Sequence, residues 1–161
     1  MNHLTAAWDL QRTANQIRSY LRQRASMYER QPGWKFSGRD DLIADLGQPF
    51  RWAPSEGLEM GEMGLCFQNA LMTALDNGWD YCEGYAVVHG VPLHHAWATE
   101  DGRTAIDSTW PEGTDYFGVR LDAQMVSRRV QKRGYYGFFA DVPDDEEMRW
   151  YKDGLPSGVL A

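Results

Sequence analysis

The segment from Gly64 to Trp110 constrains the fold of this 161-residue chain most, because it places three chemically distinctive residues on three different elements. Cys66 stands at the start of a helical pattern, His95 lies in a strand-like run, and Asp107 lies in the next such run. A thiol becomes a strong nucleophile when an imidazole takes its proton, and the imidazole needs a third group to orient it. The segment therefore predicts a helix folded onto a sheet, with thiol chemistry between them.

Helical spacing of apolar residues occurs twice before the strands. The first pattern covers 7–28, and the second covers 66–77, where Gly78 suits the left-handed position that ends a helix. The stretch 34–59 between them is broken by glycines and prolines, so we expect loops there, with one short helical turn at 40–46.

The chain after Gly78 is strand-like, with runs of aromatic and branched residues at 81–88, 92–99 and 103–108. Asp101-Gly102 is a hairpin turn signal between the last two runs. For the remainder we expect strands at 117–121 and 135–142, a helix at 121–132 and a loose acidic tail at 143–161. The sequence thus predicts one α+β domain spanning 1–161, in which helices, including the nucleophile helix, pack on an antiparallel sheet.

Composition narrows the classes of function. Because the net charge is −7, we do not expect non-specific binding to nucleic acid or to an acidic membrane. Residues 1–30 contain no apolar run of the length that a signal peptide or a membrane span needs. We therefore expect a cytoplasmic protein whose two cysteines are reduced rather than joined in a Cys66–Cys82 disulfide.

The two cysteines differ in their local setting. Cys66 follows Gly64-Leu65 at a helix start, where the positive end of the helix dipole favours a thiolate. A free cysteine is more commonly a small buried core residue, and we expect that role for Cys82, which lies inside a strand. Cys66 is therefore the candidate nucleophile.

His94 and His95 are adjacent in one strand, so their side chains point to opposite faces and one of them can face the Cys66 helix. We expect this to be His95, with Trp97 on the same face shielding the ion pair from water. Asp107 comes within cross-strand reach of His95 if the turn falls at Asp101-Gly102. An aspartate before Ser-Thr also suits a plain turn or cap.

The combination of Gly-x-Cys-Phe-x-Asn-Ala, Glu-Gly-Tyr-Ala, His-Ala-Trp and Asp-Ser-Thr-Trp resembles the core of the transglutaminase-like superfamily of papain-type cysteine enzymes. The likeness covers about 64–121, within an expected catalytic core at 60–121, and is greatest to small bacterial and phage members. It implies a papain/transglutaminase-like core with Cys66 as nucleophile, His95 as general base and Asp107 as the orienting acid. Ser108 stands where those members commonly have proline.

The resemblance leaves the oxyanion hole incomplete. Papain-type peptidases place a glutamine about six residues before the cysteine, where this chain has Met60, and Gln48 is a distant candidate. The backbone N–H of Cys66 is the donor that we expect, because main-chain groups at a helix start can form such a hole.

The expected function is a thiol acyl-transfer enzyme: a cysteine peptidase, an amidase or a transglutaminase-like protein that acts on a peptide, protein or small amide without a cofactor or a metal. A non-catalytic inhibitor or binding protein on the same scaffold is the main alternative, because a fold does not fix an activity. An arylamine acetyltransferase is disfavoured by the short chain and by the position of Asn69. A metal site at Cys66, Cys82, His94 and His95 lacks the usual ligand spacing.

Substrate contacts are expected from aromatic residues of the same region. Trp97 and Trp110 would line a cleft suited to an extended peptide or a planar group. Glu83 in that cleft would favour basic or amine-bearing substrates.

Overall fold

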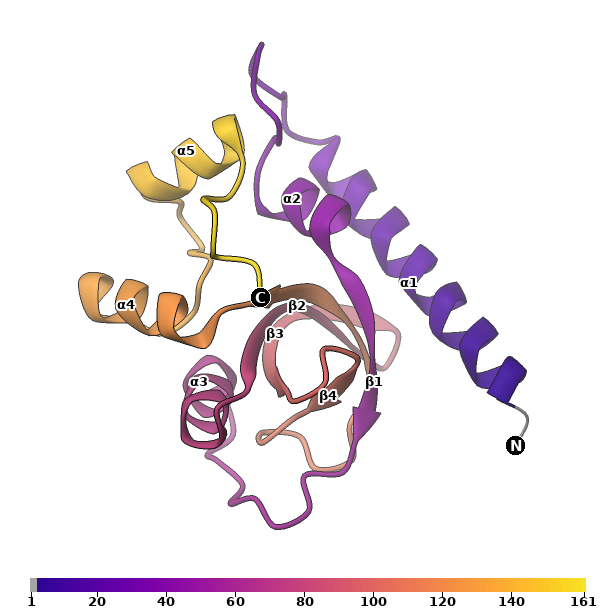
Figure 1. Ribbon diagram of the computed structural model, residues 1–161. Coiled ribbons are helices and arrows are strands. Elements are labelled where there is room, and N and C mark those ends of the chain that lie inside the picture. Colours follow the sequence, from indigo (N-terminus) through magenta and orange to yellow (C-terminus); the bar gives the residue numbers. More distant parts are fainter. Residues whose placement is uncertain (1–2) are drawn as a thin grey trace.

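The computed structural model describes residues 3–161, with side chains from residue 9 onward. Five helices surround a closed five-stranded sheet, so the fold is mixed α+β (Figure 1). In chain order the elements are α1 (His3–Ala25), α2 (Arg39–Leu46), β1 (Gln48–Ala53), α3 (Cys66–Asn77), β2 (Asp80–Val88), β3 (Val91–Thr99), β4 (Thr104–Ile106), β5 (Asp115–Leu121), α4 (Ala123–Arg133) and α5 (Asp145–Asp153).

The strands form a barrel in the order β1-β4-β3-β2-β5, closed by pairing of β5 with β1. The pairs are antiparallel except β1 with β4, which is parallel. The sheet therefore differs from the wholly antiparallel sheet that the sequence suggests, since it is closed and contains one parallel pair. Closure is weakest between β3 and β4, which pair only at Ala98 and Ile106.

The barrel interior is a small apolar cluster made of Phe50, Cys82, Ala86, Trp97, Ala105 and Tyr116. Gly84 of β2 pairs directly with Gly118 of β5, and the Trp97 indole occupies the space that a side chain at Gly118 would fill. A Cβ at Gly118 would lie 2.7 Å from the Trp97 ring, so the interior has room for the indole only beside a glycine.

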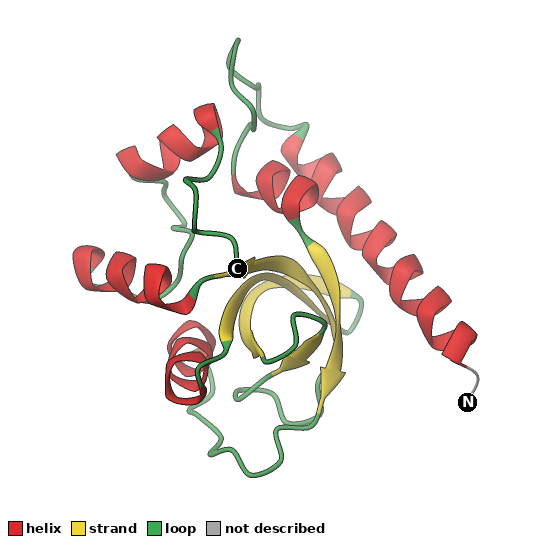
Figure 2. Ribbon diagram, viewed as in Figure 1, coloured by secondary structure: helices red, strands yellow, loops and turns green. Residues whose placement is uncertain are grey.

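The helices cover the outside of the barrel in two groups, which Figure 2 shows in red around the yellow strands. α1 and α2 pack together over β1 and β5, whereas α3 packs on β3 and β2 and also contacts α4. The larger core lies between these helices and the sheet. α3 is thereby held against β2 and β3, the two strands that precede the segment carrying Asp107.

Several expected elements are confirmed: the short helix at α2, the helix α3 with its Gly78 cap, the strands β2 and β3, the antiparallel pairing of β3 with β4 around Asp101-Gly102, β5 and α4. β1 was expected as loop because Gly47, Pro49 and Pro54 border or interrupt it. It forms nevertheless, since β5 pairs with it on one side and β4 on the other.

Two expectations for the carboxyl-terminal part are wrong. Residues 135–142 form no strand, because the backbone N–H groups of Phe138 and Phe139 bond to the Glu83 carboxylate and that of Ala140 bonds to Glu147. The acidic tail is not loose either. It contains α5, whose Trp150 and Tyr151 are buried in the larger core.

Candidate active site

Cys66 is the first residue of α3, and its side chain is partly exposed. The preceding cap residue, Leu65, offers no side-chain hydrogen bond, and the first helical bond runs from Asn69 N–H to the Leu65 carbonyl. Among the described residues, no protein group accepts a hydrogen bond from the N–H of Cys66 or Phe67. These donors remain free to bind an oxyanion beside the sulfur, as expected for a helix start.

His95 lies in the middle of β3, opposite Gly84 of β2, and is almost completely buried. The strand sends its ring and that of His94 to opposite faces. His95 Nε2 lies 2.7 Å from Asp107 Oδ2, whereas His94 Nε2 lies 3.0 Å from Glu83 Oε1. The adjacent histidines therefore have separate carboxylate partners.

Asp107 follows β4 directly and its carboxylate accepts four hydrogen bonds. Oδ2 accepts from His95 and from the Tyr116 hydroxyl at 2.8 Å. Oδ1 accepts from the backbone N–H groups of Thr109 and Trp110 at 2.8 and 3.1 Å. Burial opposes ionisation, but these bonds, led by that of His95, lower the pKa of Asp107. The carboxylate is therefore fixed and ionised beside the imidazole.

The imidazole of His95 stands between Asp107 and Cys66. Burial favours its neutral form, yet the hydrogen bond to Asp107 and the influence of the nearby Cys66 outweigh burial and raise the pKa of His95 to about 9. Because Nε2 is engaged by Asp107, Nδ1 is the ring nitrogen left to interact with the thiol. The structure thus brings the three predicted residues Cys66, His95 and Asp107 together in the order thiol, imidazole, carboxylate.

The predicted substrate-contact residues are distributed differently. Trp110 stacks on His95, with ring centroids 3.8 Å apart and planes 4° apart, so it covers the imidazole. Trp97 is fully buried in the barrel and packs on Phe50 and Tyr116, so it faces no cleft. The side chain that shields His95 from water is therefore Trp110, and not Trp97 as the sequence suggested.

Glu83 is also fully buried, and its carboxylate accepts from the Tyr81 hydroxyl, His94 and two backbone N–H groups. It anchors the 138–139 segment and has no free face for a substrate. Gln48 donates to the Gly102 carbonyl at 2.6 Å, so its amide supports the β3–β4 turn.

Nothing in the local sequence identifies Tyr116 as a partner of Asp107. Its contact depends on how β5 lies in the barrel, since β5 pairs with β2 and β1 rather than with the Asp107 segment. Asn69 belongs to the motif around Cys66 but does not contact His95 through any hydrogen bond of the described residues. Its side chain donates to Thr109 and to the Glu62 carbonyl, both at 2.9 Å, and so ties α3 to the loops on either side.

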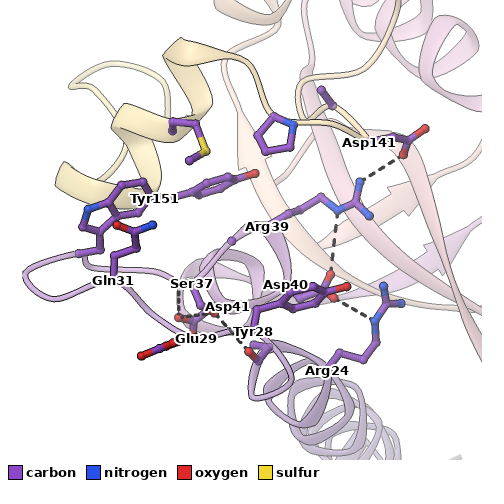
Figure 3. Close-up of a pocket in the computed structure, with 16 residues that line it drawn as sticks. Arg24, Tyr28, Glu29, Gln31, Ser37, Arg39, Asp40, Asp41, Asp141 and Tyr151 are labelled. Carbon is purple, nitrogen blue, oxygen red and sulfur yellow. Dashed lines mark hydrogen bonds and ion pairs between the residues drawn. The ribbon is translucent and has the colours of Figure 1, made fainter.

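A separate cavity of about 380 Å³ lies where the end of α1, the start of α2 and α5 meet (Figure 3). Its charged walls are largely paired internally: Arg24 bonds Asp40, and Arg39 lies 3.6 Å from Asp141. Arg39 also donates to His94 Nδ1 at 3.2 Å. Since arginine can only donate, His94 Nε2 carries the proton bonded to Glu83. His94 therefore has Arg39 and Glu83 as its polar partners, and its ring packs against Phe67, the residue after Cys66.

Comparison with known proteins finds no matching family model, no matching curated protein and no matching solved structure. Within the described residues, Cys66 and Cys82 are both free thiols, as expected. No helix in residues 3–161 combines the length and apolar character needed to cross a membrane. That same part of the chain holds no group of three or more His, Cys, Asp or Glu side chains placed to bind a metal ion.

Proposed function

We propose that this protein is a thiol acyl-transfer enzyme in which Cys66 attacks the carbonyl carbon of an amide. The observation that carries the proposal is the placement of the His95 ring, which is bonded through Nε2 to Asp107 and has Nδ1 left to interact with Cys66. This is the arrangement in which an imidazole can take a thiol proton and hold it for the leaving group.

The first half of the reaction follows from these groups. His95 Nδ1 takes the proton of Cys66, and the sulfur forms a bond to the carbonyl carbon. The negative oxygen that results is placed near the free N–H groups at the start of α3. As the C–N bond breaks, the imidazolium returns its proton to the leaving amine, and a thioester on Cys66 remains.

The second half regenerates the thiol. Water or an amine gives a proton to His95 and attacks the thioester carbon, and the C–S bond breaks with return of the proton to sulfur. Water yields a carboxylic acid and an amine yields a new amide, so hydrolysis and transfer share one acyl-enzyme. The helix-borne cysteine followed by strand-borne histidine and a downstream aspartate supports the proposed likeness to a papain/transglutaminase-like core.

The test is to trap the acyl-enzyme with an activated ester, p-nitrophenyl acetate, and to locate the acetyl group by peptide mass. We expect acetylation of Cys66 at pH 7, with loss of the label on adding an amine such as glycine methyl ester. Cys66→Ser and His95→Ala should show no burst of p-nitrophenol. Acetylation that is equally slow in wild type and His95→Ala would contradict the proposal and favour a binding protein on this scaffold.

A further inference from the structure

The charge of this chain is divided between two regions. Residues 52–119, which carry the thiol site, contain eleven Asp and Glu and one basic residue, Arg103, for a formal charge of −10. The remaining residues contain twelve acidic and fifteen basic side chains, for a formal charge of +3. The acidity of the protein therefore arises entirely from the region around the site.

Many of these carboxylates have no cationic partner within the protein. Within the described residues, eight exposed acids of this region have no Lys, Arg or His at ion-pair distance: Glu56, Glu59, Glu62, Asp76, Glu100, Asp101, Glu112 and Asp115. By contrast, the buried acids Glu83 and Asp107 are saturated with donors. The exposed acids thus present an uncompensated negative field to solvent.

Four of these acids, Glu56, Glu59, Glu62 and Glu112, lie on two loops beside the nucleophile helix, and Asp76 lies on that helix itself. Residues 54–65 run directly into Cys66, and 107–114 carry Asp107 and Trp110 (Figure 1). Gly61 N–H donates to the Ser108 carbonyl at 2.8 Å, so the two loops are joined. The field is consequently fixed in place around the thiol rather than spread over flexible segments.

A groove of about 410 Å³ lies between residues 58–62 and one flank of α3. It reaches Asn69, one helical turn after Cys66, and Ser108, the neighbour of Asp107. Glu59, Glu62 and Asp76 are its charged lining residues, and no Lys or Arg lines it. A Cβ on Gly61 would lie 2.2 Å from the Asn69 side chain, so the wall packs closely on the helix. Low-dielectric walls concentrate the field of such carboxylates.

We propose that the thiol site acts on cationic substrates, namely amides flanked by Lys or Arg in a basic peptide segment, whose positive side chain enters this acidic groove. The inference rests on the proposed function, because it names the substrate class of the same site. Anionic substrates are repelled by the same carboxylates, so the charges select as well as attract.

The experiment compares two thiol reagents of similar shape and opposite charge, trimethylammonioethyl and sulfonatoethyl methanethiosulfonate. Each forms a mixed disulfide with the Cys66 thiolate and releases methanesulfinate. The rate at which each reagent labels Cys66 is divided by its rate with free 2-mercaptoethanol, which removes the difference in intrinsic reactivity. Peptide mass confirms that the label is on Cys66. We expect the normalised rates to favour the cation by about tenfold or more at low ionic strength. In about 0.5 M salt the ratio should approach one, because the Debye length falls below about 5 Å.

The triple variant Glu59→Gln, Glu62→Gln, Asp76→Asn should lower this ratio several-fold at low salt. The matched control Asp9→Asn, Glu29→Gln, Asp153→Asn changes the net charge equally, in the helical region, and should leave the ratio unchanged. A wild-type ratio near one, or an equal loss in both triples, overturns the proposed substrate class.

Uncharged methyl methanethiosulfonate tests the reactivity of Cys66 independently of the preference for cationic substrates. If it labels Cys66 rapidly while the charge ratio is near one, the thiol site stands and the cationic preference fails. If Cys66 does not react with the uncharged reagent in the folded chain, the proposed function fails and the substrate class fails with it.

Discussion

The indole of Trp110 lies flat on the imidazole of His95, with 3.8 Å between ring centroids. The backbone N–H of Trp110 also donates to the Asp107 carboxylate, so this residue both covers the imidazole and helps to hold the carboxylate that orients it. The stack keeps water from the bond between His95 and Asp107, and a hydrogen bond is stronger where water is excluded.

We expect Trp110→Ala to slow alkylation of Cys66 by iodoacetamide at pH 6 about fivefold, since weakening one hydrogen bond costs about 1 kcal/mol. Trp110→Phe keeps an aromatic cover and should stay within about threefold of wild type by the same relation. The measurement is the second-order labelling rate. Equal rates in all three proteins would show that the stack has no part in positioning His95.

Replacement of His94 and of His95 should have different effects in the same labelling assay. His95→Ala removes the partner of the thiol and should reduce labelling of Cys66 at pH 6 to that of an ordinary cysteine, whose pKa is about 8.5. His94→Ala should leave the labelling within about tenfold, because the His94 ring bonds Glu83 and Arg39 instead. Cys82 serves as an internal reference, since burial raises its pKa well above the usual range and its thiol is inaccessible. A larger loss in His94→Ala than in His95→Ala would reverse the assignment.

Asp107 should govern the alkaline limit of turnover. The imidazolium that returns a proton to the leaving amine is present below the His95 pKa of about 9 and is lost above it. Asp107→Asn removes the strongest interaction that raises this pKa, so the alkaline limb should move to lower pH. Turnover should fall by up to about 10⁴-fold where the base is misoriented. A pH–rate profile of acyl transfer tests this, and an unchanged limb would make Asp107 a turn residue only.

The same pair makes stability depend on pH. The pKa of His95 is raised on folding from an ordinary value of about 6.5, so its stabilisation is fully present below pH 6.5 and is lost as pH rises through about 9. Urea unfolding of the wild type should show a decrease of up to about 3 kcal/mol across this window. Asp107→Asn should show a much smaller slope there, and parallel slopes would contradict the coupling.

Glu83 should matter for stability rather than for chemistry. Glu83→Gln replaces one acceptor oxygen with an amide N–H group that faces donors, and we expect a loss of about 3 kcal/mol in unfolding free energy. The exposed Glu62→Gln should change stability by less than about 0.5 kcal/mol. Urea titration followed by tryptophan fluorescence reports both values. A neutral effect of Glu83→Gln would mean that the carboxylate is not the anchor of residues 138–139.

The local parts of this fold were predictable from sequence because their signals are local. Helix α3 shows its period and its Gly78 cap within thirteen residues, the residue types of β2 and β3 predict strands, and Asp101-Gly102 predicts the turn between β3 and β4. The opposite faces of His94 and His95 follow from strand geometry alone. These features suffice to propose Cys66, His95 and Asp107.

The parts that were not predictable depend on distant partners. β1 has a weak signal because of Pro49, and it exists through pairing with β4 and β5. Residues 135–142 have strand-like composition, but the buried carboxylates of Glu83 and Glu147 take their N–H groups. Glu83 was predicted as a cleft residue because its sequence neighbours do not reveal which face of β2 meets this segment.

The closure of the barrel also has a consequence for how the chain folds. β1 must wait for β4 and β5, which are made about 50 to 70 residues later, and such non-local pairing slows folding. Tyr116 on β5 reaches Asp107 only when that pairing is complete. We therefore expect Cys66 to acquire its enhanced reactivity in the slowest refolding phase. A newly made or partly unfolded chain would then carry a thiol of only ordinary reactivity.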